Sequence, residues 1–138
     1  MPDPQPPQTN DFDALSATQP VAEARFVCAR HATEAGVVRL HGSDAAGWMA
    51  VVDSFVSSLR QRIAASAAEP LRDALGRGDV RAIYRLDLEW APFYCADCDV
   101  SYCGQCWRTM PVFDPDFPGW LEEIRGTCPR DHERMLSD

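Results

Sequence analysis

The chain has 138 residues and a formal net charge of −8, with 13 basic residues against 21 acidic residues. This length allows one compact domain with a hydrophobic core of moderate size. The negative charge argues against nucleic acids as partners, because proteins bind phosphate backbones through clusters of Lys and Arg. All basic residues are Arg, and together with the abundant Ala, Asp and Pro this composition indicates a GC-rich bacterial genome.

The N-terminal segment, residues 1–22, is rich in Pro, Gln, Asp and Thr and has few apolar positions. Such a composition predicts a disordered tail, and residues 23–138 then form the folded domain. The chain has no basic segment followed by an apolar one, as a signal peptide would have, and no apolar run of eighteen residues. We therefore expect a cytoplasmic protein that does not enter a membrane.

The first part of the domain is expected to contain a short strand from Ala24, a turn at 28–31 and a second strand around 37–40. Ser43 and Asp44 then predict the start of a long helix over residues 45–65. The helix prediction depends on apolar residues that recur every three or four positions. These residues are Trp48, Val52, Phe55, Leu59 and Ile63.

A second, shorter helix is predicted over 71–75, between Pro70 and Gly76, so that residues 44–78 form a helical insertion. Residues 80–90 alternate between apolar and charged side chains, which predicts a strand that leads into the cysteine-rich segment. These elements indicate an α+β fold with a small antiparallel sheet that carries metal-binding turns, and with one long amphipathic helix.

The cysteines and histidines follow the spacing of metal ligands. All six cysteines and two of the three histidines fall into four pairs, which are Cys28–His31, Cys95–Cys98, Cys103–Cys106 and Cys128–His132. Two such pairs complete a tetrahedral Zn²⁺ site, so the sequence predicts two zinc ions per chain. A disulfide framework would need an oxidising compartment and would leave the two paired histidines unexplained.

Eight ligands in two closed sites favour structural zinc over catalytic zinc, which keeps an open position for water or substrate. No cysteine remains as a nucleophile, and there is no glycine-rich phosphate loop. The remaining histidine, His41, has no catalytic partner that the sequence reveals. We therefore expect a binding or scaffolding module and not an enzyme.

The central run Cys-x2-Cys-x4-Cys-x2-Cys, residues 95–106, resembles the middle of FYVE, AN1, RING-like and in-between-RING zinc domains. The resemblance implies a treble-clef zinc fold, although the Arg-His-His cluster of FYVE domains is missing and their lipid function is therefore not implied. The first pair also stands much farther from the second than in RING domains. The C-terminal segment, residues 126–138, looks like the ends of small uncharacterised actinobacterial zinc proteins.

The same resemblance offers two ways to group the pairs. In cross-brace domains the first and third pairs share one ion and the second and fourth share the other, whereas in-between-RING domains use sequential pairs. We favour the cross-brace, because a strand before Cys95 and a helix that begins at Cys128, with Pro129 in its first turn, resemble a treble clef. This grouping places Cys28, His31, Cys103 and Cys106 in site 1 and Cys95, Cys98, Cys128 and His132 in site 2.

An irregular loop with alternating aromatic and acidic residues is predicted over 112–120, followed by a short helix at Glu122 and Glu123. Its aromatic residues either cover the zinc sites or form an exposed surface that binds a protein. The residues considered for protein binding are Trp107, Phe113, Phe117 and Trp120. The sequence thus indicates a cytoplasmic zinc module with a protein partner. The alternatives are a RING-like accessory of protein modification and a zinc sensor or carrier.

Overall fold

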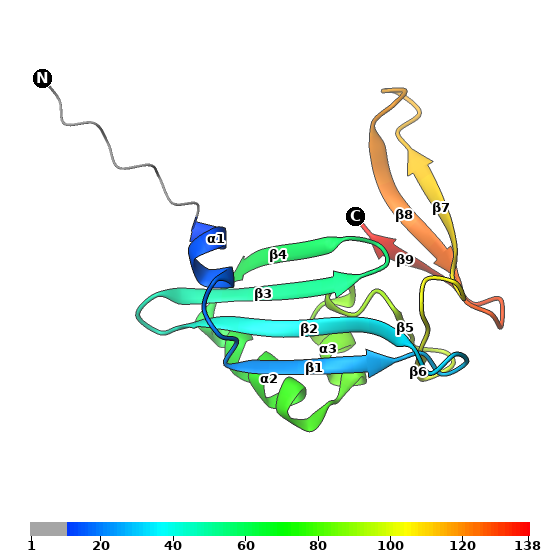
Figure 1. The fold of residues 1–138 in the computed structure, drawn as a ribbon. Helices are drawn as coiled ribbons and strands as arrows, with labels where there is room; N and C mark the ends of the chain where they lie inside the picture. The colour runs from blue at the N-terminus through cyan, green and yellow to red at the C-terminus, as the bar shows by residue number, and fades with distance from the viewer. Residues whose placement is uncertain (1–10) are drawn as a thin grey trace, which may run out of the picture.

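The computed structural model describes residues 11–138 as an α+β fold with three antiparallel sheets (Figure 1). The largest sheet has the order β1-β2-β3-β4, with β1 Ala22–Val27, β2 Glu34–Ser43, β3 Gly47–Ser54 and β4 Ser58–Ile63. The second sheet pairs β5 Tyr94–Cys95 with β6 Val100–Ser101. The third has the order β7-β8-β9, with β7 Arg108–Phe113, β8 Leu121–Thr127 and β9 Glu133–Ser137. The helical elements are α1 Asp11–Ser16, α2 Ala65–Arg77, α3 Val80–Leu86 and the short 3-10 helix η1 Leu88–Trp90.

The main hydrophobic core lies between the four-stranded sheet and the helices α2 and α3. Val38, Leu40 and Val52 point from the sheet into this core, and Leu71 and Leu75 meet them from α2. Full burial of a Leu or Val side chain contributes about 1.5–3 kcal/mol. The alanines of α2 allow the helix to approach the sheet closely, and Gly78 ends it in a left-handed conformation (φ +62°). None of the helices described within residues 11–138 is long and apolar enough to cross a membrane.

The long helix predicted over 45–65 is wrong, because this segment forms the hairpin of β3 and β4. Four of the five apolar positions assigned to one helix face do share a face, but it is a face of the sheet, and the fifth, Phe55, lies in the β3–β4 turn. Val52 pairs with Leu59 across the hairpin, and Trp48 pairs with Ile63. Their spacing also fits a helix, whereas the β-branched pair Val51 and Val52 favours a strand.

The strand predicted over 80–90 is also wrong, because the segment forms α3 and then η1. The Asp79 side chain caps α3 by accepting a hydrogen bond from the Ala82 amide. Only Ile83 of α3 is fully buried, so the alternation of charged and apolar residues does not mark a sheet. The shorter helix predicted at 71–75 is present within the longer α2, and the helical part of the predicted insertion 44–78 therefore begins at Ala65.

Part of the predicted tail is folded. Residues 1–10 lie outside the described residues, but α1 follows, and Leu15 packs on Met49 and Val51. This contact lies on the face of the large sheet opposite α2 and α3, since Met49 and Val51 alternate along β3 with the core residues Ala50 and Val52. The ordered domain therefore begins before residue 23.

Arg134 of β9 connects the third sheet to the rest of the molecule. Its guanidinium donates hydrogen bonds to the carbonyl oxygens of Leu88, Ala91 and Tyr94, at distances of 2.7 to 2.9 Å. The same group lies over the ring of Tyr84, 5.2 Å from its centroid. One side chain thus satisfies three backbone carbonyls around η1 and β5, and it fixes β9 against them.

Candidate metal centres

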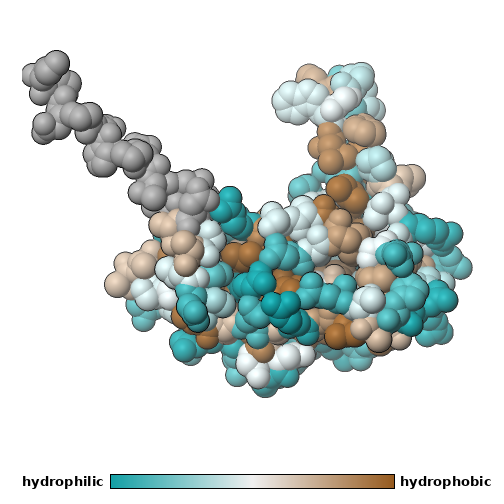
Figure 2. All heavy atoms as spheres, viewed as in Figure 1, coloured by the Kyte–Doolittle hydropathy of each residue, from teal (hydrophilic) through white to brown (hydrophobic). Residues whose placement is uncertain are grey.

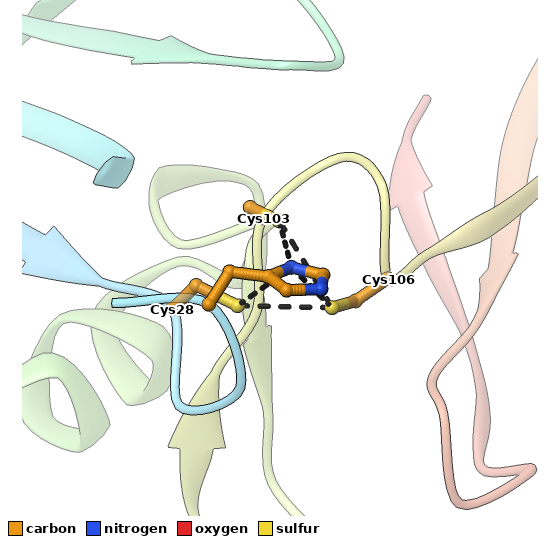
Figure 3. Close-up of side chains that lie close together, drawn as sticks. Cys28, Cys103 and Cys106 are labelled. Atoms are coloured by element: carbon orange, nitrogen blue, oxygen red, sulfur yellow. Dashed lines mark hydrogen bonds between the residues drawn. The ribbon is translucent and has the colours of Figure 1, made fainter. Parts of the chain in front are cut away.

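Site 1 joins two turns that are far apart in the sequence. Cys28 follows β1 and His31 lies in the turn before β2, while Cys103 and Cys106 lie in the loop between β6 and β7. Figure 3 shows the three cysteine side chains converging from these two segments. The first turn is closed by hydrogen bonds between the Cys28 amide and the Thr33 carbonyl and between the Ala32 amide and the Cys28 carbonyl. Ala32 adopts a left-handed conformation that turns the chain back into β2.

The distances in site 1 are those of a tetrahedral metal centre. The sulfur of Cys106 lies 3.7 Å from that of Cys28 and 3.9 Å from that of Cys103. The His31 Nδ1 atom lies 3.2 Å from the Cys103 sulfur. Four ligands around one Zn²⁺ at about 2.3 Å would place their sulfurs about 3.8 Å apart, whereas disulfide sulfurs lie about 2.05 Å apart.

Site 2 is built in the same way from two other turns. Cys95 and Cys98 flank the turn between β5 and β6, and Cys128 and His132 flank the turn between β8 and β9. The sulfurs of Cys98 and Cys128 are 3.8 Å apart. The Nδ1 atom of His132 lies 3.2 to 3.6 Å from all three sulfurs of the site. All six cysteines of the chain are free of disulfides.

Backbone amides stabilise some of the thiolates that a metal requires. The amides of Arg130 and His132 point at the Cys128 sulfur, at 3.3 and 3.4 Å. Burial on its own would raise the pKa of Cys128, but these amides, together with hydrogen bonds from the Cys95 and Cys98 thiols, hold the pKa below its ordinary value. Burial likewise opposes a lowered pKa at Cys28 and Cys103, where backbone amides lower it at Cys28, and the Gln105 amide with hydrogen bonds from neighbouring side chains lowers it at Cys103.

The thiols of Cys95 and Cys106 keep their protons more firmly. Burial, and then the neighbouring thiols, raise the pKa of Cys106 to about 12, and burial is also the main cause that raises the pKa of Cys95 to about 12. Crowded thiols of this kind resist joint ionisation, because each added negative charge repels the next. A bound cation removes this repulsion, so the arrangement fits a metal better than an apo cluster.

The grouping of the four pairs is that of a cross-brace, with the first pair beside the third and the second beside the fourth. The helix predicted to begin at Cys128 is wrong, because residues 128–132 form the tight turn between β8 and β9. The Cys128 amide donates to the His132 carbonyl, and the Asp131 amide donates to the Cys128 carbonyl. The predicted treble-clef helix is thus absent from the described part of the chain.

The residues considered for protein binding separate into two groups. Trp107 is only 4% exposed, and its indole donates to the carbonyls of Phe93 and Tyr102, so it belongs to the core around the metal ligands. Phe113, Phe117 and Trp120 are 52%, 61% and 72% exposed. They do not cover the metal sites. Most of the loop predicted over 112–120 is present as residues 114–120, which connect β7 to β8, whereas the short helix predicted at Glu122 and Glu123 is wrong, because both residues belong to β8.

Sequence reasoning missed the side chains that enclose the ligands. Tyr102 and Leu136 pack against the cysteines, and Phe55 stacks on Trp107 from the β3–β4 turn, with 6.5 Å between ring centroids. The sequence signals for these contacts are weak, because they join elements whose pairing depends on the fold. His41 is buried in β2 beside Thr18, and burial lowers its pKa, so its ring is neutral at pH 7.

Fold and site together define an α+β domain with two Cys3His groups that could each hold a metal ion. The model of a family described as a domain of unknown function, DUF8328, matches residues 18–138, and the chain belongs to this family. No curated protein and no solved structure matches the chain. The two clusters are compatible with zinc fingers in general, and the comparisons identify none of the named zinc families that the central motif resembles.

Proposed function

We propose that this domain is a cytoplasmic, zinc-stabilised module that binds a protein partner and has no catalytic activity. The observation that carries the proposal is the pair of complete Cys3His groups, each of which joins two segments distant in sequence. Three thiolates and one imidazole in a tetrahedron are typical of structural Zn²⁺. The six free thiols also support a reducing compartment.

The position of each site supports a structural role. Site 1 would fix the β1–β2 turn of the large sheet to the loop before β7, and site 2 would fix the second sheet to the third. Four protein ligands fill the tetrahedron, so a zinc ion there has no vacant position for a substrate or an activated water. Apparent binding energies of about 10–16 kcal/mol per structural zinc are comparable to the whole stability of a small domain.

The charge and the exposed surface support a protein as the partner. Each Cys3His site with Zn²⁺ adds roughly one negative charge to a chain that already carries −8, which disfavours nucleic acids and anionic lipids. Phe113, Phe117 and Trp120 are exposed on one hairpin. Aromatic side chains on a well-defined hairpin are common anchors of protein interfaces.

The proposal is tested by metal analysis and controlled metal removal. Protein purified without added metal should contain close to two zinc ions per chain. A strong chelator should remove them only as fast as the C-terminal region unfolds, as followed by near-UV circular dichroism and released zinc. One zinc per chain, or chelation that leaves the fold intact, would contradict a structural role at both sites.

A second function, zinc sensing or delivery, is favoured by one observation at site 2. A cavity of about 170 Å³ borders Cys95 and His132, with Asp97 and Glu133 also in its lining. Such an opening would let an external ligand approach the ion. Rapid loss of one zinc to a chelator, with the site 1 zinc and the fold retained, would favour this function over the structural one.

A further inference from the structure

The hairpin of β7 and β8 projects from the body of the protein as an arm (Figure 1). Strand alternation gives the arm two different faces. The outer face carries charged residues in ion pairs, and Arg125, for example, forms ion pairs with Glu123 and Glu133. The inner face carries Thr109, Pro111, Phe113, Leu121 and Ile124, and Glu122 lies beside it at a bulge in β8.

The inner face continues into a groove at the base of the arm. This groove has a volume of about 460 Å³, and Thr109 and Ile124 of the arm line it opposite Phe55 and Val56 of the β3–β4 turn. Gly104, beside the site 1 ligand Cys103, also lines it. Figure 2 shows hydrophobic residues running up the arm from its base. A β-hairpin with one apolar face normally packs that face on a core, but no described element covers the outer half of this one.

The far end of the arm has a defined shape. The Asp114 amide donates to the Trp120 carbonyl, and the Trp120 amide donates to the Phe117 carbonyl. The rings of Phe117 and Trp120 lie 6.1 Å apart between centroids. Gly119 takes a left-handed conformation (φ +94°) that closes the turn. A surface ordered in this way loses little conformational entropy when a partner binds.

Charge indicates what kind of partner the surface fits. Asp114, Asp116 and Glu122 lie beside the apolar residues, and none of them pairs with a cationic side chain in the described part of the chain. An anionic membrane would be repelled by these carboxylates. A second copy would bring the same carboxylates and the same net charge against the first. A polypeptide with Arg or Lys next to apolar residues has the complementary chemistry.

We propose that the inner face of the β7–β8 arm binds an apolar segment of a partner protein that also carries Arg or Lys. An apolar side chain of that segment occupies the groove between Ile124 and Phe55, and its cations meet Asp114, Asp116 and Glu122. This inference rests on the proposed function as a protein-binding module, and it names the surface and the class of partner.

The test uses a phage-displayed library of random peptides, selected against the full-length, zinc-loaded protein. Selected sequences should combine apolar residues with Arg or Lys, and the synthetic peptide should bind more weakly as salt is raised. The double variant Phe113→Ser, Leu121→Ser should weaken binding of that peptide at least tenfold in calorimetry. Met110→Ser is the matched control, because Met110 is 57% exposed on the outer face of the same strand and its loss should leave affinity unchanged.

Other outcomes overturn the inference, and two of them leave the proposed function intact. Peptides that bind the double variant as well as the parent would place the interface elsewhere on a protein-binding module. Selected peptides without cations would refute the assigned partner chemistry. If the parent protein dimerises in sedimentation and the double variant does not, the partner is a second copy of the chain. If the parent protein binds phosphatidylserine vesicles and the double variant does not, the partner is a membrane. If the protein with two bound zinc ions selects no peptide from the library, protein binding itself is refuted.

Discussion

The two halves of the molecule bury different kinds of side chain. The large sheet with α2 and α3 encloses aliphatic and aromatic residues such as Val38, Leu71 and Phe93. The buried cluster around β5–β9 consists mostly of cysteine ligands, with Tyr102, Trp107 and Leu136 around them. The first half has the apolar contacts of an ordinary small domain, whereas the second has few apolar contacts apart from those that enclose its ligands. Metal should therefore govern the stability of the second half much more than that of the first.

The largest effect is expected from Cys95→Ser, which leaves site 2 with three good ligands. Serine binds Zn²⁺ poorly, so most of the roughly 10 kcal/mol or more that a structural zinc contributes is lost. The third sheet should unfold while the large sheet keeps its slow amide exchange, as measured by hydrogen exchange and metal analysis. Asp97→Asn serves as the control, because Asp97 is exposed in the same turn. This variant protein should retain two zinc ions. A folded Cys95→Ser protein with two zinc ions would contradict this division.

The reverse test is Leu71→Ala in α2. Leu71 is fully buried in the main core, and its truncation should lower the free energy of unfolding by about 2–5 kcal/mol. Zinc content at neutral pH should stay at two, because the residue contacts neither site. Leu86→Ala on the neighbouring helix is the control, since Leu86 is 40% exposed and its truncation should cost much less. Loss of zinc from Leu71→Ala would show that the two halves do not separate energetically.

The connection between the halves is tested by Arg134→Met. Methionine keeps much of the side-chain volume but removes three charged hydrogen bonds, and we expect a loss of about 1–3 kcal/mol. The carbonyls of Leu88 and Ala91 keep backbone amide donors, from Ala91 and Tyr94 respectively. The variant should also make unfolding of the two halves less cooperative in a denaturant titration followed by tryptophan fluorescence and circular dichroism. Arg130→Met, at an exposed position in the adjacent turn, should change neither quantity. If both variants lower stability and cooperativity equally, Arg134 does not connect the two halves.

The sequence predicted the metal half better than the apolar half, and the reason is physical. Ligand pairs such as Cys95 and Cys98 are a local signal, because a turn alone brings two residues at this spacing to one ion. Apolar spacing is ambiguous, and Val52 with Leu59 fits either one helix face or a hairpin pair. The exposure of Trp120 could not be predicted, since it depends on where the arm projects and not on the residues around it.

The smallest expected effect concerns the polar face of the large sheet, at Asp53. A hydrogen bond from Ser58, and then the contact with Arg39 at 2.6 Å, hold the pKa of Asp53 below its ordinary value despite partial burial. A carboxyl whose pKa is lower in the folded than in the unfolded state stabilises the fold above its unfolded pKa of about 3.9, and this contribution disappears as pH falls through the folded value.

Asp53→Asn should therefore lower stability at pH 7, and its difference from the parent protein should shrink as the pH falls below 4. Because the side chain is 44% exposed, solvent screens the pair, and we expect at most about 1 kcal/mol at pH 7 and less at high salt. Urea titrations between pH 7 and pH 3 measure this difference, with Asp73→Asn as the control at a more exposed ion pair of α2. Thiolate protonation at low pH releases zinc from both proteins alike, so only the difference between variant and parent is informative. A difference that stays constant down to pH 3 would show that the Asp53 carboxylate does not stabilise the sheet.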